Sequence, residues 1–430
     1  MILMMISILV PLFLGVPIAV TLGGSGLVWL VILNPAHLRG AGYALWNIAD
    51  NYILISVPLF LLMGEIIQRS DIAQRFYRAM SLWLRWLPGG LLHANIGACG
   101  VFSAVSGSSV ATAATIGTAA IPNLMALGYD RRLIFGTLAA GGTLGILIPP
   151  SIPLIIYAAL VEVSLGRLFI AAAVPGLMML VLFAAYIGWR AWRDPAVSPP
   201  VPLDETRTRR RELLGSIGDV LPVLAIILVV LGGIYFGWAT PTEVAALGVL
   251  IALVVAAAYR RLTWTVIRES VVAAVTFTSM LMFVIIGAHI FSYALFAWGM
   301  TREATSWVAD LAVAPVVVLG VIVLIYLVLG MFIDALSMMV LTLSVVFPIV
   351  TGLGYDPVWF GVVLVMLLEI GLITPPVGIN LYTIQGLIPG LTNVLEVARG
   401  ALPFVLLLLI GVGLLVAFPD IALWLPRQMY

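Results

Sequence analysis

The residues Leu-Gly-Tyr-Asp (127–130) and Gly-Ile-Leu-Ile-Pro-Pro (145–150) recur 226 positions later as Leu-Gly-Tyr-Asp (353–356) and Gly-Leu-Ile-Thr-Pro-Pro (371–376). Pro122 and Pro348 are separated by the same interval. The repetition indicates a duplicated unit, and in each copy a proline pair interrupts a long apolar segment. Such a unit is typical of the ion and substrate site of a secondary transporter.

The composition excludes an ordinary soluble domain. Hydrophobic residues make up 63% of the chain and charged residues 9%, and the mean hydropathy is +1.21. A soluble fold of 430 residues needs far more charge on its surface. Apolar segments long enough to span a lipid bilayer recur throughout, which predicts an all-α polytopic membrane protein.

Several other function classes are excluded as well. The chain has no basic domain interleaved with aromatic residues, so we expect no nucleic-acid partner. Cys99 is the only cysteine, which excludes zinc clusters and iron–sulfur centres. An intramembrane enzyme needs a nucleophile–base pair or metal ligands at membrane depth, and no such set converges here. We therefore expect a transporter without an organic cofactor.

Two kinds of apolar segment follow one another along the chain. The stretches 90–127 and 313–351 each read as two helical legs around a polar or glycine-bearing tip, at 103–109 and 330–334. Such tips are costly in lipid and favour re-entrant hairpins that are buried in protein. The other apolar segments are long enough to span, and we expect them at 4–33, 52–68, 131–161, 168–193, 216–236, 241–260, 270–297, 357–388 and 400–425.

These segments divide the chain into five parts. We expect N-terminal scaffold helices, a first transport repeat, an arginine-rich loop, further scaffold helices and a second transport repeat. Each scaffold part ends in an amphipathic arm helix, at 71–88 and 300–311, which suits the membrane interface. The five parts cover 1–88, 89–193, 194–215, 216–311 and 312–425.

The arginines predict the orientation. If the loop at 194–215 is cytoplasmic, the order of segments places sixteen arginines inside or at the inner boundary and four outside, as the positive-inside rule requires. The N-terminus is then cytoplasmic and the C-terminus lies on the opposite side. Five crossings separate the broken helix starting at 131 from the one starting at 357, counting each hairpin as none. Because five is odd, we expect an inverted repeat.

The proline pairs release backbone carbonyls. Proline has no amide hydrogen, and its ring clashes with the carbonyl four residues back. The prolines at 149–150 therefore release the carbonyls of residues 145–146, and those at 375–376 release the carbonyls of residues 371–372. We expect each helix to unwind at its glycine, and Na⁺ is a natural partner for the freed oxygens. The alternative is that the prolines only kink packed helices.

Inverted symmetry places one hairpin tip beside each unwound segment, which predicts two or more coupling Na⁺ ions. The first is expected near Ser103, Ser106, Gly145, Ile148 and Pro150. The second is expected near Gly330, Asp334, Gly371, Thr374 and Val377. Asp334 is the best candidate for a functional carboxylate because it lies at a predicted tip.

The solute is expected between the two tips. Ser108 and Ser109 open the second leg of the first hairpin, where helix N-terminal amides carry a partial positive charge. Thr374 and Asn380 add polar atoms from the second broken helix. No intramembrane arginine is positioned as a counter-ion, so an anionic solute depends on helix dipoles, hydroxyls and the accompanying Na⁺.

Four other carboxylates have less specific interpretations. Glu369 is a ligand, a proton site or a hydrogen-bonded structural group. Glu65 lies near the end of its segment, where a solvated or interfacial carboxylate is expected. Asp130 and Asp356 follow Gly-Tyr and are expected to cap the next helix.

Three motifs resemble those of a known family. They are Ser-Gly-Ser-Ser-Val-Ala-Thr-Ala-Ala-Thr-Ile-Gly (106–117), Gly-Ile-Leu-Ile-Pro-Pro-Ser (145–151) and Glu-Ile-Gly-Leu-Ile-Thr-Pro-Pro-Val-Gly-Ile-Asn (369–380). Together with the length and the repeats, they make the chain similar to the large membrane (permease) subunit of tripartite ATP-independent periplasmic (TRAP) transporters. The resemblance implies a bacterial inner-membrane Na⁺ symporter of small carboxylated solutes that works by an elevator mechanism.

The same resemblance implies two protein partners. A periplasmic solute-binding protein delivers the solute, and a small four-helix membrane subunit, expected as a separate chain, holds the permease. The family's sodium sites match the two sets of residues given above. The alternatives are a self-sufficient Na⁺/dicarboxylate symporter that needs no binding protein, and a passive channel.

Overall fold

The computed structural model describes residues 2–199, 206–311 and 313–429, and the regular structure of these ranges is helical, with no β-strand. Eight of the described helical stretches are long and apolar enough to cross a membrane. The predicted all-α polytopic membrane fold is therefore confirmed.

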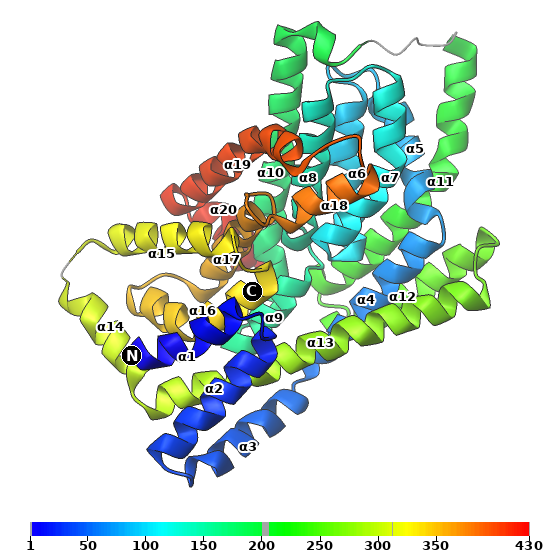
Figure 1. Cartoon of the computed structure of the whole chain (residues 1–430). Coiled ribbons are helices and arrows are strands. Elements are labelled where there is room, and N and C mark those ends of the chain that lie inside the picture. Colours follow the sequence, from blue (N-terminus) through cyan, green and yellow to red (C-terminus); the bar gives the residue numbers. More distant parts are fainter. Residues whose placement is uncertain (1, 200–205, 312, 430) are drawn as a thin grey trace.

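Two sets of five helices follow the same order (Figure 1), and the starts of equivalent helices lie 224 to 229 residues apart. The first set is α6 (Leu91–Ser106), α7 (Ser109–Ala126), α8 (Arg131–Leu147), α9 (Ile152–Val161) and α10 (Leu165–Arg193). The second set is α15 (Pro315–Gly330), α16 (Ala335–Gly352), α17 (Pro357–Leu372), α18 (Ile379–Leu387) and α19 (Val394–Ala417). Because α7 and α16 correspond at both ends, the duplication extends from the motifs to the helix boundaries.

Equivalent side chains begin equivalent helices. Ser108 caps α7 and Asp334 caps α16, each by accepting a backbone N–H of the first helical turn. Asp130 and Asp356 cap α8 and α17 in the same way, which confirms the two predicted caps. Each cap satisfies an amide that the helix itself leaves without a partner.

Both repeats contain a helical pair followed by a broken helix. α6 and α7 are joined at 107–108, and α15 and α16 at 331–334. Residues 148–151 separate α8 from α9, and residues 373–378 separate α17 from α18. Each break contains a proline pair whose peptide bond is cis. The assignment of these elements to scaffold and transport units stays a prediction.

The helices break later than expected. We predicted unwinding at Gly145 and Gly371, but both glycines lie inside α8 and α17. A proline ring pushes the preceding residue out of the helical conformation. Ile148, which precedes Pro149, accordingly has extended backbone angles, with φ −76° and ψ 121°. In α8, the break therefore begins at the residue before the proline pair and not at the glycine.

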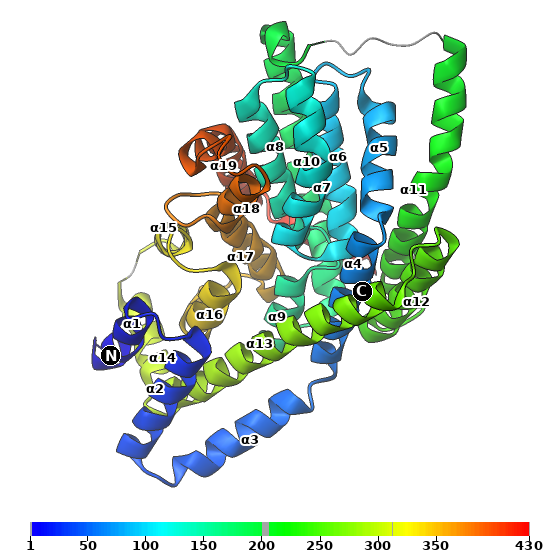
Figure 2. The same cartoon turned by 45° about the vertical axis from the view of Figure 1, so that its right-hand side comes forward.

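The remaining helices pack around the repeats. α2 (Ile18–Leu33) runs beside α13 (Trp264–Ala297), which crosses the molecule diagonally in Figure 1. α4 (Ser56–Arg69) packs against α12 (Pro241–Ala258) and α13. α5 (Ile72–Leu84) contacts α11 (Thr206–Tyr235) and stands beside α6 and α7 in Figure 2. The other elements are α1 (Ile2–Phe13), α3 (His37–Ala49), η1 (Tyr52–Ile55), η2 (Pro195–Val197), α14 (Met300–Asp310) and α20 (Asp420–Met429).

Three predicted segments are divided differently in the structure. The single span expected at 4–33 is two helices, α1 and α2, because Pro17 precedes α2 with a non-helical backbone and no amide hydrogen. The span expected at 400–425 is α19 followed by α20, with Pro419 between them. The loop expected at 194–215 is shorter because α11 begins at Thr206, and its residues 200–205 lie outside the described ranges.

Helix α17 lies at the buried centre of the molecule. Every residue of α17 from Val358 to its last residue is buried. The indole nitrogen of Trp359 donates to the Leu415 carbonyl of α19 at 3.0 Å. The Tyr157 hydroxyl of α9 donates to the Pro357 carbonyl at 2.6 Å, which joins the first repeat to the second.

We expect Gly400→Ala to destabilise the protein. An added Cβ at Gly400 would lie 2.2 Å from the Arg132 carbonyl oxygen, so α8 and α19 would have to separate. Overpacking of this kind costs about 1–3 kcal/mol, to be measured as a lower Tm in detergent. Gly413→Ala on the same helix is the control, since nothing lies within 4 Å of its added Cβ. Equal Tm values for both variants would contradict this helix contact.

Candidate functional site

The two hairpin tips line one large cavity. The cavity has a volume of about 760 Å³, and its walls include Ser108 and Ser109 from the first tip and Asp334 from the second. Ile152 and Ile379, which begin the second halves of the two broken helices, complete this side. The structure thus brings together the tips and the breaks that the sequence singled out, and it leaves a space of ligand size between them.

The first tip is a tight turn held by hydroxyl groups. Gly107 has φ +60°, and a Cβ there would lie 3.0 Å from the Pro150 carbonyl oxygen, so the turn needs glycine. The Ser106 and Thr112 hydroxyls lie 2.8 Å apart. The Thr112 hydroxyl also donates to the Ser108 carbonyl at 2.8 Å. These bonds fix the direction in which the first turn of α7 faces the cavity.

The first predicted Na⁺ set is only partly gathered at this tip. An added Cβ on Gly145 would lie 2.7 Å from the Ser108 carbonyl oxygen, so α8 touches the tip backbone directly. Pro150 reaches the tip through Gly107. Ser103, in contrast, donates to the Cys99 carbonyl of its own helix at 2.5 Å. The Ile148 side chain packs against Gly176 of α10.

Two of the carbonyls expected to be free have partners in the chain. The Gly371 carbonyl accepts the Thr374 N–H at 3.4 Å. The Ile146 carbonyl accepts a hydrogen bond from the Ser151 hydroxyl, which also caps α9. Ser151 was not among the predicted site residues. Its position directly after the proline pair and before an apolar run is an N-cap signal that identifies it in retrospect.

Four of the five residues of the second predicted Na⁺ set line a small cavity. Its volume is about 10 Å³, roughly the space of one water or ion. The four residues that line it are Gly330, Asp334, Gly371 and Val377. Gly330 and Gly371 are in backbone contact, since a Cβ added to either would lie 2.9 Å from the other's Cα.

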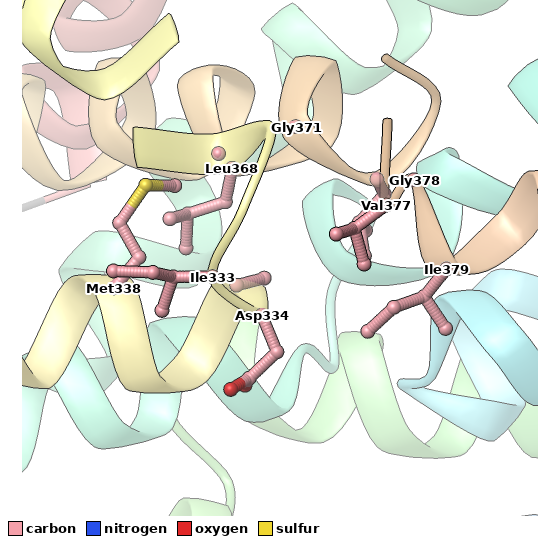
Figure 3. A pocket seen from close by; sticks show the side chains of 11 residues that line it. Ile333, Asp334, Met338, Leu368, Gly371, Val377, Gly378 and Ile379 are labelled. Atoms are coloured by element: carbon pink, nitrogen blue, oxygen red, sulfur yellow. The ribbon is translucent and has the colours of Figure 1, made fainter. Parts of the chain in front are cut away.

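Several polar groups at the second tip already form hydrogen bonds within the chain. The Val377 N–H donates to the Met331 carbonyl at 3.1 Å, which joins the break to the hairpin. The Thr374 hydroxyl donates to the Ile370 carbonyl at 2.6 Å, and Thr374 is not among the residues lining the small cavity. Figure 3 shows the Asp334 side chain pointing away from Gly371. The exposed Asp334 carboxylate therefore stands between the small cavity and the large one, both of which it lines.

Asn380 joins the two repeats. Its side-chain nitrogen donates to the Ser109 hydroxyl at 2.7 Å and to the Ala139 carbonyl at 3.2 Å. Asn380 is fully buried and is not among the residues that line the large cavity. Of the four residues predicted to bind solute, Ser108 and Ser109 lie on the cavity wall, whereas Thr374 and Asn380 do not. Asn380 instead positions Ser109.

The opposite wall of the large cavity comes from helices outside the repeats. α4 contributes Glu65 and Gln68, and α13 contributes Phe277 and Met280. Glu65 was expected at an interface, but it lines the cavity and forms an ion pair with Arg69 at 2.9 Å. Glu65, Gln68 and Arg69 lie together at the end of an otherwise largely apolar helix, so the sequence alone does not indicate which face meets the tips.

Glu369 lies apart from both cavities. It is fully buried in α17, and neither carboxylate oxygen has a hydrogen-bond partner among the described residues. It is not among the residues that line the small cavity, although Leu368 beside it is.

Comparisons with known proteins give a consistent family. Residues 5–421 match the family model described as "Tripartite ATP-independent periplasmic transporter, DctM component". The chain is 35% identical over 415 residues to a C4-dicarboxylate TRAP transporter large permease protein of Pseudomonas aeruginosa, covering 95% of this chain and 94% of the relative. It is 31% identical over 419 residues to a sialic acid TRAP transporter large permease protein of Vibrio cholerae, covering 97% and 96%.

A solved structure has a similar fold. The YdaH transporter of Alcanivorax borkumensis superposes with a TM-score of 0.63 at 16% identity, over 91% of each chain. At this identity the likeness concerns the fold alone.

We expect Asn380→Ala to loosen the contact between the repeats. The change removes the donor to Ser109 and leaves a buried hydroxyl without this partner. Losing a buried hydrogen bond costs about 1–3 kcal/mol, to be measured as a lower Tm in detergent. Asn47→Ala, at an exposed position of α3, is the control. A Tm for Asn380→Ala equal to that of the control would contradict a structural role for this bond.

Proposed function

We propose that this chain, which belongs to the DctM component family of the tripartite ATP-independent periplasmic transporters, takes up a small carboxylated solute in symport with Na⁺. It is a multi-pass membrane protein and not an enzyme, as its relatives are named transporter permeases. The observation that carries the proposal is the convergence of both hairpin tips on one ligand-sized cavity, with an ion-sized cavity beside the second tip.

The proposed second Na⁺ site is the small cavity. Asp334 supplies a carboxylate, and Gly330, Gly371 and Val377 bring backbone carbonyls to the same walls. Oxygen ligands of these two kinds suit a hard cation. In the proposed site the Thr374 side chain adopts another rotamer, because its hydroxyl now donates to the Ile370 carbonyl of α17.

The proposed first Na⁺ site lies at the first tip. Ser106 and the Ser108 backbone are in contact with one another and with Gly145 and Pro150 through the turn. Ser103 and Ile148 complete the proposed ligand set by hydroxyl and carbonyl oxygens. Binding of the ion would replace some of the hydroxyl bonds that now close the tip.

The solute is proposed to bind in the large cavity. The hydroxyls of Ser108 and Ser109 and the first amides of α7 present partial positive charge to a carboxylate. Glu65 on the opposite wall has the same charge as such a solute, although Arg69 is paired with it. The bound Na⁺ ions then contribute to the balance of charge.

The proposed movement is of elevator type. The two repeats move together as one body, since α17 packs against α9 and α10 of the first repeat and Asn380 joins α18 to α7. They slide against α4 and α13, which form the opposite wall of the large cavity. Each Na⁺ that crosses a potential of 100 mV contributes about 2.3 kcal/mol, so two contribute roughly 4–5 kcal/mol.

The proposed partners and location follow from the family. A periplasmic binding protein delivers the solute, and a small four-helix membrane subunit associates with the permease in the bacterial inner membrane. The N-terminus is proposed to be cytoplasmic and the C-terminus periplasmic. The alternative, a Na⁺/dicarboxylate symporter that acts without a binding protein, is separated from this proposal by the second experiment below.

We expect Asp334→Asn to weaken Na⁺ binding while the helix cap is kept. The amide oxygen still accepts the Ser337 N–H, but the negative charge is gone. The Na⁺ concentration for half-maximal uptake should rise about tenfold, equivalent to ~1.4 kcal/mol, in proteoliposomes with Na⁺ or choline outside. Ser106→Ala should act in the same direction, and the exposed Asp50→Asn should not. Unchanged Na⁺ dependence in both site variants would remove these residues from the ion sites.

We expect solute uptake to depend on the binding protein. Because the permease itself presents few specific polar groups to the solute, delivery by the partner should raise uptake by at least about tenfold in proteoliposomes that contain both membrane subunits. The measurement compares uptake with and without a periplasmic solute-binding protein added as the proposed partner. Full uptake without it would favour the self-sufficient symporter, and uptake unaffected by replacing Na⁺ with choline would favour a channel.

A further inference from the structure

The large cavity continues into a series of smaller spaces along α7. A second cavity of about 410 Å³ shares Glu65, Gln68 and Ser108 with it. A third of about 290 Å³ shares Gln68 with the second. A fourth of about 710 Å³ shares Gln74 and Thr118 with the third. A series of cavities with shared lining residues, called the hollow below, therefore extends from the tips, past α4, to the far end of α5.

The wall that α7 gives to this hollow is one small and polar face. Ser108, Ala111, Thr115, Thr118 and Asn123 line successive cavities at helical spacing. Such spacing keeps the five side chains on one side of the helix. The face holds no carboxylate and no large apolar residue, so it leaves room for a small polar solute over the length of α7.

The fourth cavity is lined by two arginines, the exposed Arg78 and the half-buried Arg85. Arg78 and Arg85 lie seven positions apart, on one face of α5 and at its end, and both line the cavity. Neither has an ion-pair partner among the described residues, and the Arg85 Nε is buried without a hydrogen bond. Arg75 of the same helix differs, because Asp219 pairs with it at 3.4 Å and its guanidinium lies over the Tyr259 ring.

A buried guanidinium nitrogen without an acceptor costs free energy that a bound anion would recover. Guanidinium groups bind carboxylates through parallel N–H donors. The cavity also offers Gln74 and Ser81 as neutral hydrogen-bonding groups. It therefore has the volume, charge and donors of a site for a small carboxylate.

We propose that the cavity between α5 and α7 is a second, transient binding site for the carboxylate of the transported solute, held by Arg78 and Arg85. This inference rests on the proposed uptake of a carboxylated solute. In the large cavity the solute faces Glu65, whose charge is paired with Arg69. When Na⁺ departs, the positive charge that the ions add to that cavity is lost, which favours movement along α7 toward the two arginines. The two arginines receive it at the other end, on the side that the arginine distribution assigns to the cytoplasm.

The test measures the electrostatic potential of the cavity with a cysteine reporter. Cys99 is fully buried, so a cysteine introduced as Asn123→Cys on the exposed end of α7 is the reporting thiol. The full chain in nanodiscs of zwitterionic lipid is labelled with a sulfonate-bearing and with a trimethylammonium-bearing methanethiosulfonate. The ratio of anionic to cationic labelling rate should fall about tenfold or more in R78Q/R85Q.

Three controls make the rate ratio specific. R78K/R85K should keep most of the ratio because it keeps the charge, and equal gel-filtration profiles show that the variants are folded. Arg268→Gln, at an exposed position of α13 outside the four cavities, should leave the ratio unchanged. An equal ratio in wild type, R78Q/R85Q and R268Q would overturn the proposal.

A second arm tests for ligand binding with succinate as the probe. Millimolar succinate should slow labelling of Asn123→Cys by neutral N-ethylmaleimide in the wild-type background and not in R78Q/R85Q. Protection by phosphatidylglycerol in the nanodisc, without protection by succinate, would assign the arginines to lipid and overturn the proposal. Neither arm depends on Na⁺-driven uptake, so a failure of the proposed transport function leaves these two readouts interpretable by themselves.

Discussion

The need to satisfy backbone polar groups inside a membrane governs this structure. A continuous helix meets that need by itself, whereas a helix broken by a proline pair does not. At both breaks a hairpin tip packs against the broken helix, and at the second break the Val377 N–H also donates to the Met331 carbonyl of the tip. Gly145 and Gly371 have no side chain, and this allows α8 to touch the Ser108 backbone and α17 to touch Gly330.

The two repeats meet this need in different ways. In the first repeat, the glycine of the broken helix contacts the start of the second hairpin leg, and the Ser151 hydroxyl bonds the Ile146 carbonyl. In the second, the equivalent glycine contacts the end of the first leg, and an ion-sized cavity remains. Val377 stands where the first repeat has Ser151, so no hydroxyl takes the equivalent role. The duplicated sequence therefore produces two non-equivalent sites.

Different parts of the fold form the two walls of the large cavity. The repeats contribute the tips, the breaks and the polar face of α7, and α4 and α13 contribute the opposite wall. The buried Asn380 side chain donates to the Ser109 hydroxyl and so links the two repeats. In the proposed elevator movement, the cavity opens or closes between the repeats on one side and α4 and α13 on the other, without any change inside the repeats. The line of cavities toward Arg78 and Arg85 follows that same boundary.

The sequence determined the duplicated unit, the helical pairs, the two breaks, the capping aspartates and the membrane class, because proline chemistry, capping and apolar length are local properties. It misplaced the point of unwinding by a few residues, since a proline ring excludes its immediate neighbour from the helix and leaves the glycine helical. Only the tertiary structure decided that Asn380 is a buried link, that Glu65 lines the cavity and that Arg78 and Arg85 lack the partner that Arg75 has. These facts depend on which faces of distant helices meet, and no local pattern encodes that.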